Sequence, residues 1–221
     1  MKANQTLIGA DGKHEVALFP MPYIYITQGE GGSYSHRNTY NIDFVGYNGS
    51  VTIIRAPVYA PCTMKVVNFM PSFSGGHGVT FESVDKVYLA NGQLDYLTIL
   101  FMHCDNPPYT SIGQTVKQGQ LCYRSGNFGY STGDHLHSCC GQGHYRGLVQ
   151  RAGGNWDLAN RIHYWDGVYI NDTGVKVGYG YAWKRYSGGS PAPTPAPSGG
   201  VYKRDGFPWP IARHHWPNFK R

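Results

Sequence analysis

The sequence predicts a mainly β protein built on an antiparallel β-sheet. Short apolar runs alternate with turn residues along most of the 221-residue chain, and the composition is rich in glycine (30) and tyrosine (18). Aromatic and β-branched residues favour strands, whereas Gly, Asn and Pro end them. Because turns follow the apolar runs so closely, antiparallel pairing is favoured over parallel strands joined by crossover helices.

Seven segments are predicted as strands because each is an apolar or alternating run bounded by turn residues. In chain order they are 23–27, 41–45, 63–68, 78–83, 96–104, 120–123 and 136–140. The predicted turns occupy 29–33, 48–49, 74–76, 91–92 and 126–133, which are rich in Gly, Asn and Ser. A helical apolar period is visible only at 157–163, where a short helix is expected.

Composition divides the chain into three parts. Residues 1–186 are expected to form one domain, because they hold nearly all the apolar runs. Residues 187–200 (SGGSPAPTPAPSGG) have the composition of a linker, with a stiff Pro-rich middle and flexible Gly ends. Residues 201–221 are basic and aromatic and too short for a core of their own. They are either a disordered end or a docking peptide whose aromatic rings anchor on a partner.

The net charge of +6 suits an anionic polymer as partner, and both nucleic acid and a Gram-positive cell wall qualify. No basic run or base-stacking motif points to nucleic acid, so none is expected as a partner. No apolar stretch is long enough to span a bilayer. Residues 1–15 lack the apolar core of a secretion signal, so the chain is expected to leave its cell by lysis or within a virion. The five cysteines lack a Cys-x-x-Cys pair and are expected as free thiols.

The strongest chemical motif is Asp134-His-Leu-His137. Alternate side chains of a strand share a face, so His135 and His137 point the same way. Two such imidazoles can both bind one metal ion, or one can bind the ion while the other acts as a base. A His-x-His motif on its own does not decide between these uses.

Two other segments carry candidate residues. His36 follows a glycine-rich turn, and Asp43 stands between Ile42 and Phe44 in a predicted strand, so that its carboxylate faces one side. Asp43 is either a ligand or a partnered structural acid. His103 ends the apolar run 97–103 and is either structural or catalytic. Two histidines and one aspartate would match a catalytic Zn²⁺ site, which uses three protein ligands and leaves one position for water.

Five segments in order make the chain resemble the lysostaphin-type zinc endopeptidases, also called LytM-like peptidases. The most specific is 125–137 (SGNFGYSTGDHLH), which is similar to the family's glycine-rich loop ending in His-Leu-His. The others are 35–44 (SHRNTYNIDF), 56–61 (APVYAP), Met102-His103 and 113–120 (GQTVKQGQ). The resemblance covers roughly 26–141, over half of the chain, and implies an antiparallel β-sheet with a loop-lined groove.

The resemblance also implies residue roles. It makes His36, Asp43 and His137 the Zn²⁺ ligands and His103 and His135 the catalytic histidines. It implies hydrolysis of peptide bonds in bacterial peptidoglycan, either in glycine-rich cross-bridges or next to D-alanine in stem peptides. Two departures stand out: the family's tyrosine just before the first histidine is absent, with Tyr34 as a candidate substitute, and the usual Phe-Glu after His-Leu-His is replaced. In its place, Cys139 follows on the face of the two histidines and is either buried packing or close to the metal.

The absent secretion signal, the Pro-rich linker and the short basic tail are typical of a bacteriophage protein. We therefore expect a virion-associated tail lysin that opens the wall during infection, with the tail segment docking on phage tail proteins. The alternatives are a free phage endolysin for host lysis and a non-catalytic peptidoglycan-binding or structural virion protein.

Overall fold

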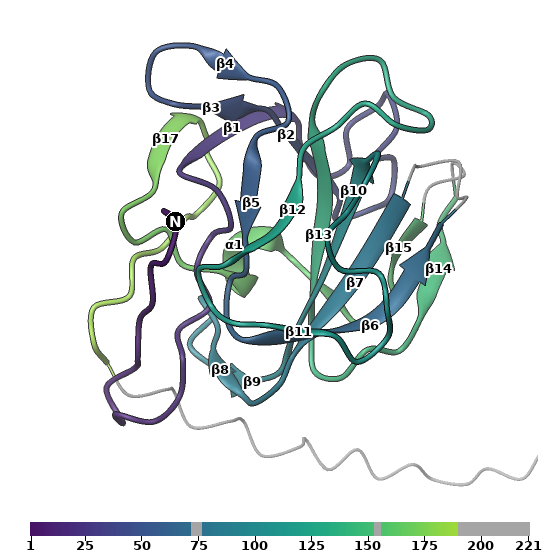
Figure 1. Ribbon diagram of the computed structural model, residues 1–221. Coiled ribbons are helices and arrows are strands. Elements are labelled where there is room, and N and C mark those ends of the chain that lie inside the picture. The colour runs from purple at the N-terminus through teal and green to yellow at the C-terminus, as the bar shows by residue number, and fades with distance from the viewer. Residues whose placement is uncertain (72–76, 153–155, 190–221) are drawn as a thin grey trace, which may run out of the picture.

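A computed structural model of the protein describes residues 1–71, 77–152 and 156–189. Its main sheet has nine strands, eight of which follow the order β11-β6-β7-β10-β13-β2-β1-β17, while β16 pairs with β13. Figure 1 shows the long strands of this sheet side by side through the middle of the molecule. These strands span β1 (Tyr23–Gln28), β2 (Ile42–Phe44), β6 (Met64–Met70), β7 (His77–Ser83), β10 (Leu97–Cys104), β11 (Thr115–Val116), β13 (Leu136–Gln142), β16 (Arg161–Ile162) and β17 (Gly174–Val177).

Four two-stranded ribbons surround the main sheet. They pair β3 (Gly46–Tyr47) with β4 (Thr52–Ile53), β5 (Pro57–Tyr59) with β12 (Leu121–Arg124), β8 (Val87–Tyr88) with β9 (Leu94–Asp95), and β14 (Leu148–Gln150) with β15 (Trp156–Leu158). The single helix in the described part of the chain is α1 (Tyr164–Gly167), one turn long. All pairings between these strands are antiparallel except that of β1 with β17, which is parallel.

The core lies between the main sheet and the ribbons. Phe19, Phe44 and Tyr164 meet edge to face within it, at ring-centroid separations of 5.1–6.0 Å. Burial of such large apolar rings is the main stabilising term of a small β domain. The five cysteines are all buried with free thiols, and burial raises the pKa of each.

The predicted fold class is confirmed: the regular secondary structure of the described chain is almost entirely strand, and its pairing is dominantly antiparallel. Each of the seven predicted strands corresponds to an observed one, with ends shifted by three residues or fewer. The predicted turn at 74–76 lies outside the described residues, as does most of the predicted linker (190–200) and the whole of 201–221.

The predicted helix at 157–163 is wrong. That stretch holds the end of β15 and all of β16, and the helix begins only at Tyr164. Tertiary contacts determine the conformation here, because the buried Asp157 accepts hydrogen bonds from the Tyr40 backbone N–H (3.0 Å) and the Arg161 guanidinium (2.8 Å). A continuous helix would break the pairing of β15 with β14.

Candidate active site

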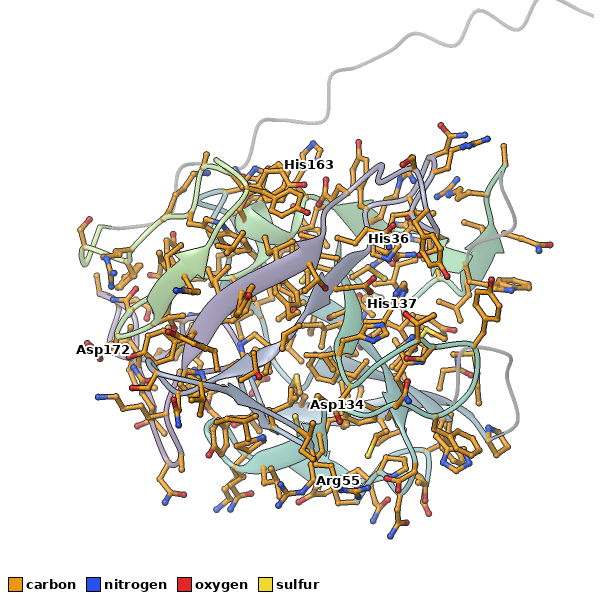
Figure 2. The ribbon with its side chains drawn as sticks, turned by 90° about the horizontal axis from the view of Figure 1, so that it is seen from above. His36, Arg55, Asp134, His137, His163 and Asp172 are labelled. Carbon is orange, nitrogen blue, oxygen red and sulfur yellow. The ribbon has the colours of Figure 1, made fainter. Side chains whose placement is uncertain are left out.

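Three neighbouring strands carry most of the predicted site residues. In the pairing of β13 with β2, His137 lies opposite Asp43, and in the pairing of β13 with β10 it lies opposite Met102. His103 follows Met102 directly, so the register of the sheet alone brings Asp43, His103 and His137 together. His36 enters from the loop between β1 and β2, and Figure 2 shows it beside His137.

The first group consists of His36, Asp43 and His137. His36 Nε2 lies 3.2 Å from His137 Nδ1 and 3.2 Å from Asp43 Oδ1, and His137 Nδ1 lies 3.0 Å from Asp43 Oδ1. A tetrahedral zinc ion with bonds of about 2.1 Å separates its ligand atoms by roughly 3.4 Å. Two imidazole nitrogens and one carboxylate oxygen therefore meet at nearly the spacing that such an ion requires, and the three residues fit Zn²⁺.

The remaining polar atoms of this group are also satisfied. His36 is fully buried, and its Nδ1 lies 3.1 Å from the carbonyl oxygen of Gly29, so Nδ1 carries the proton and Nε2 keeps its lone pair. Burial alone would raise the pKa of Asp43, but the contacts of its carboxylate with His137 and His36 outweigh burial and hold the pKa of Asp43 below its ordinary range. Asp43 is thus ionised, as a metal ligand must be.

The second group is a pair of histidines, His103 and His135, whose ring centroids lie 4.4 Å apart. His103 Nδ1 lies 2.9 Å from the carbonyl oxygen of Phe128, and His135 Nδ1 lies 2.8 Å from that of Gly133. Each carbonyl accepts the Nδ1 proton, so in the neutral form of each imidazole the lone pair lies on Nε2. His135 Nε2 lies 3.5 Å from Asp43 Oδ1, which places this lone pair beside the first group.

His103 is held in an unusual state. It is 4% exposed and its backbone has φ 79°, in the left-handed region that residues with a Cβ rarely adopt. Burial first, and then the neighbouring His137 and His135, lower the pKa of His103 to about 3. Its imidazole is therefore neutral at any pH at which the protein is expected to work, and backbone strain of this kind is typical of functional sites.

The loop before β13 is fixed to the end of β10. Gly126 and His135 exchange backbone hydrogen bonds of 3.0 and 2.9 Å, and the Phe128 N–H donates to the His103 carbonyl at 3.0 Å. Asp134 accepts from the Ser125 hydroxyl (2.5 Å) and from the Arg55 backbone N–H (3.0 Å), and Figure 2 shows Asp134 beside Arg55. These hydrogen bonds hold His103 and His135 in place, although the two histidines lie on different segments of the chain.

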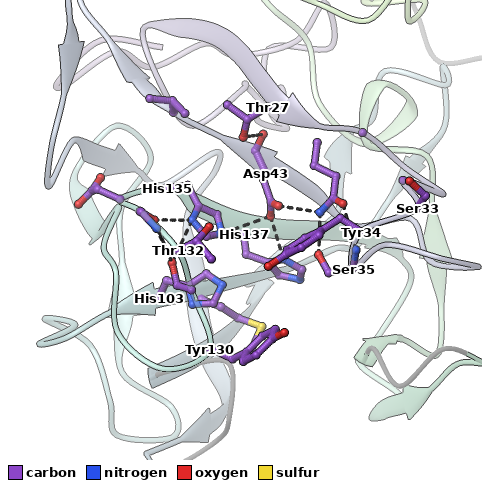
Figure 3. Close-up of a pocket in the computed structure, with 18 of the residues that line it drawn as sticks. Thr27, Ser33, Tyr34, Ser35, Asp43, His103, Tyr130, Thr132, His135 and His137 are labelled. Atoms are coloured by element: carbon purple, nitrogen blue, oxygen red, sulfur yellow. Dashed lines mark hydrogen bonds and ion pairs between the residues drawn. The ribbon is translucent and has the colours of Figure 1, made fainter.

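The site opens into a groove of about 950 Å³. Figure 3 shows Asp43, His103, His135 and His137 facing it, with Tyr34 and Tyr130 beside them. Tyr34 and Tyr130 are 71% and 76% exposed, so their rings are free to contact a ligand. The groove combines these exposed aromatic rings with hydroxyl groups of Ser and Thr, as ligand-binding clefts often do.

All five residues that the sequence singled out lie in or directly beside this groove. Cys139 does not join them, since it is fully buried among Leu100, Met102 and Leu158. In the described part of the chain, the metal-competent groups at the groove are His36–Asp43–His137 and His103–His135–His137, without Cys139. Sequence reasoning missed Gln28, whose side-chain amide contacts Asp43, and Phe128, whose carbonyl fixes His103.

Comparison with known proteins finds similarity both to curated proteins and to solved structures. Morphogenesis protein 1 of Bacillus phage B103 is 35% identical over 173 residues, which cover 77% of this chain and 44% of that protein. The chain therefore spans less than half the length of this relative. No model of a protein family matches the chain. In the described residues, no helix has the length and apolar character needed to cross a membrane.

Among solved structures, the catalytic domain of the antimicrobial peptidase lysostaphin from Staphylococcus simulans is 26% identical, with a TM-score of 0.37, over 58% of this chain and 80% of that one. A zinc-containing peptidase from Vibrio cholerae is 23% identical, with a TM-score of 0.40, over 57% of this chain and 37% of that one. The chain is thus similar in sequence to a phage morphogenesis protein, and lysostaphin, whose family its motifs resemble, is among its structural neighbours.

Proposed function

We propose that the protein is a zinc metalloendopeptidase that hydrolyses peptide bonds in bacterial peptidoglycan. One observation carries the proposal: three ligand atoms of His36, Asp43 and His137 lie 3.0–3.2 Å apart, beside the unprotonated Nε2 atoms of His103 and His135. A metal site next to free bases is the arrangement of a metal-assisted hydrolase. The motif resemblance to lysostaphin-type peptidases supports the substrate class.

In this proposal, His36 binds Zn²⁺ through Nε2, His137 through Nδ1 and Asp43 through Oδ1. The chemistry that the ion supplies when bound is Lewis acidity toward water and toward the scissile carbonyl. The donor set of two neutral imidazoles and one carboxylate leaves the site a net positive charge with the ion bound, which suits the stabilisation of negative charge on the substrate.

His135 is the proposed general base. Its Nε2 is unprotonated and lies beside the ligand group, so it accepts the proton of the attacking water as the bond from water oxygen to carbonyl carbon forms. The same nitrogen then gives the proton to the amine nitrogen as the C–N bond breaks. His103, neutral and with its Nδ1 proton held by Phe128, accepts a hydrogen bond from the water and orients it.

A groove lined by exposed tyrosines supports the binding of an extended peptide on both sides of the scissile bond. Tyr34 is the proposed substitute for the tyrosine that the resembled family places before its first histidine, because it lines the groove on the side of that loop. Its hydroxyl would donate a hydrogen bond to the developing oxyanion.

The phage relative supports a role in a virion over release of a free enzyme at host lysis. That protein is named for morphogenesis, which is the assembly of the particle. We therefore propose a virion-associated lysin that opens the wall during infection. Residues 201–221 are proposed as the segment that docks on phage tail proteins, and deleting them should abolish incorporation into particles while hydrolysis by the purified protein persists. Unchanged incorporation would rule out the docking role.

Digestion of purified sacculi tests the enzymatic proposal. Sacculi of several wall types would be incubated with the protein, with and without a chelator, and the products analysed by mass spectrometry. New amino termini at one peptide bond, lost on chelation and restored by Zn²⁺, would support the proposal and identify the bond. If the zinc-loaded protein bound sacculi but cleaved none of them, the non-catalytic wall-binding alternative would replace it.

A further inference from the structure

The side chain of Gln28 links the proposed metal ligand Asp43 to Ser35, the residue before His36. Gln28 is the last residue of β1 and lies opposite Asp43 in the pairing of β1 with β2. Its Nε2 donates to Asp43 Oδ2 at 3.0 Å and to the Ser35 hydroxyl at 2.7 Å, while its Oε1 accepts from the Ser35 backbone N–H at 3.1 Å. The amide therefore uses two donors and one acceptor, and its orientation is fixed by these partners.

The hydrogen bond from Gln28 to Asp43 determines which oxygen of the carboxylate faces the proposed metal position. Asp43 Oδ2 is held by Gln28, and Oδ1 alone faces His36 Nε2, His137 Nδ1 and His135 Nε2, at 3.0–3.5 Å. A carboxylate without this restraint can rotate about its Cβ–Cγ bond and change which oxygen it presents. Gln28 thus restricts Asp43 to one oxygen as a ligand.

The contacts to Ser35 hold the turn that carries the first histidine. Ser35 immediately precedes His36, and Gly29, which accepts the Nδ1 proton of His36 at 3.1 Å, immediately follows Gln28. One side chain and its neighbouring carbonyl therefore act on both His36 and Asp43. A neutral amide suits this place, because it donates hydrogen bonds to the carboxylate without neutralising the charge that the metal needs.

We propose that Gln28 is a positioning residue of the metal site, which fixes Asp43 as a one-oxygen ligand and ties it to the turn before His36. The proposal rests on the metal site of the proposed function and adds a residue that the sequence motifs did not single out. Gln28 does not ligate the ion itself in this account. Its effect is expected on zinc affinity first, and on hydrolysis only through the ion.

The test is the zinc affinity of Gln28→Met, measured by competition with a chromogenic chelator. Methionine matches the length of glutamine but lacks its donors, so the side chain still fills the space. Residues that orient metal ligands through hydrogen bonds contribute about 10- to 100-fold to metal affinity, so the dissociation constant should rise by that factor. The absorption spectrum of the Co²⁺-loaded variant should also change, because the Asp43 carboxylate is no longer restrained.

Two further variants separate this role from general destabilisation. Ser35→Ala removes only the hydroxyl contact to Gln28 and should change zinc affinity less than about 3-fold, well below the loss that a ligand-orienting residue gives. Gln114→Met makes the same substitution in the remote turn before β11, where Gln114 accepts from the backbone of Thr110 and Ser111. It should leave zinc affinity unchanged. Should Gln28→Met fail to fold, Gln28→Asn keeps the amide but shortens its reach, and is expected to weaken zinc binding in the same direction.

Equal zinc affinity in the parent protein and a folded Gln28 variant would overturn the proposal while leaving the proposed function intact. A loss of zinc affinity in Ser35→Ala as large as that in Gln28→Met would also overturn the proposal. Gln28 would then affect zinc binding through the turn before His36 and not through the Asp43 carboxylate. A parent protein that binds no zinc would contradict the proposed function itself, and the role of Gln28 with it.

Discussion

His36 Nε2 and His137 Nδ1 lie 3.2 Å apart although the two residues are separated by 101 positions in the sequence. Asp43 Oδ1 lies within 3.2 Å of both nitrogens. Without a metal ion, this proximity is supported by hydrogen bonds among the three side chains. In the proposed zinc site, the same three atoms would serve as the ligands with little rearrangement.

Asp43→Ala is expected to abolish zinc binding and hydrolysis together. The substitution removes the ligand that carries the negative charge and leaves two neutral imidazoles, which bind Zn²⁺ far more weakly. Zinc content of the purified variant, measured by mass spectrometry of the metal, and sacculus digestion would be compared with the parent. A variant that kept one equivalent of zinc would show that Asp43 is not a ligand.

His135→Ala should separate binding from catalysis. The variant keeps His36, Asp43 and His137 and should retain zinc, but it lacks the Nε2 atom that accepts the proton. General bases contribute about 10²- to 10⁴-fold to rate, so hydrolysis should fall by that factor. Full activity in a zinc-loaded His135→Ala protein would exclude His135 as the base.

Gly126→Ala tests the close approach of the loop to β10. A Cβ at Gly126 would lie 2.1 Å from the carbonyl oxygen of His103, so the backbone there must shift. We expect a loss of roughly 1–3 kcal/mol in the free energy of unfolding, as for other overpacked sites, together with reduced hydrolysis because His103 moves. Gly133→Ala is the matched control, because a Cβ there meets nothing within 4 Å. Urea unfolding measures the free energy of unfolding of both variants, and equal values would contradict the loss predicted for Gly126→Ala.

Glu82 gives a pH-dependent contribution to stability. Burial alone would raise its pKa, but hydrogen bonds from the Tyr145 N–H (2.7 Å) and from His144 (3.0 Å) outweigh it and hold the pKa of Glu82 below its ordinary value. The ordinary pKa of a glutamate is about 4.3, so this stabilisation is full above that pH and is lost as the pH falls through the lower folded-state value.

Glu82→Gln should therefore lower the free energy of unfolding near neutral pH and have a smaller effect in acid. Urea unfolding of the parent and the variant at about pH 7 and about pH 3 measures the difference at each pH, which removes the contribution of other titrating groups. A difference that is the same at both pH values would show that the ionised carboxylate contributes no net stability.

The central strands and the shared face of His135 and His137 could be predicted because both depend on local rules. A strand alternates its faces every residue, so His135 and His137 were expected to share one face, and Asp43, between two apolar residues, was expected to present its carboxylate to one side of its strand. The meeting of Asp43 with His137 then depends on the register of β2 against β13, which the sequence alone does not specify.

Features that depend on distant partners could not be predicted in this way. The stretch 157–163 has a helical apolar period, yet Asp157 bonds to Tyr40, and the Asn160 amide donates to Thr98 and to the carbonyls at the end of β13 and directly after it, so both side chains are used in tertiary contacts. No local sequence pattern marks Gln28 either, because its partners Ser35 and Asp43 lie 7 and 15 positions away. Only the folded chain reveals such links.

Zinc titration of the metal-free protein, with sacculus hydrolysis measured in each sample, tests the central claim most directly. The account predicts no hydrolysis without zinc, a rise in proportion to added zinc, and a plateau near one equivalent, at which the site of His36, Asp43 and His137 is filled. Hydrolysis by the metal-free protein that does not change as zinc is added would contradict it.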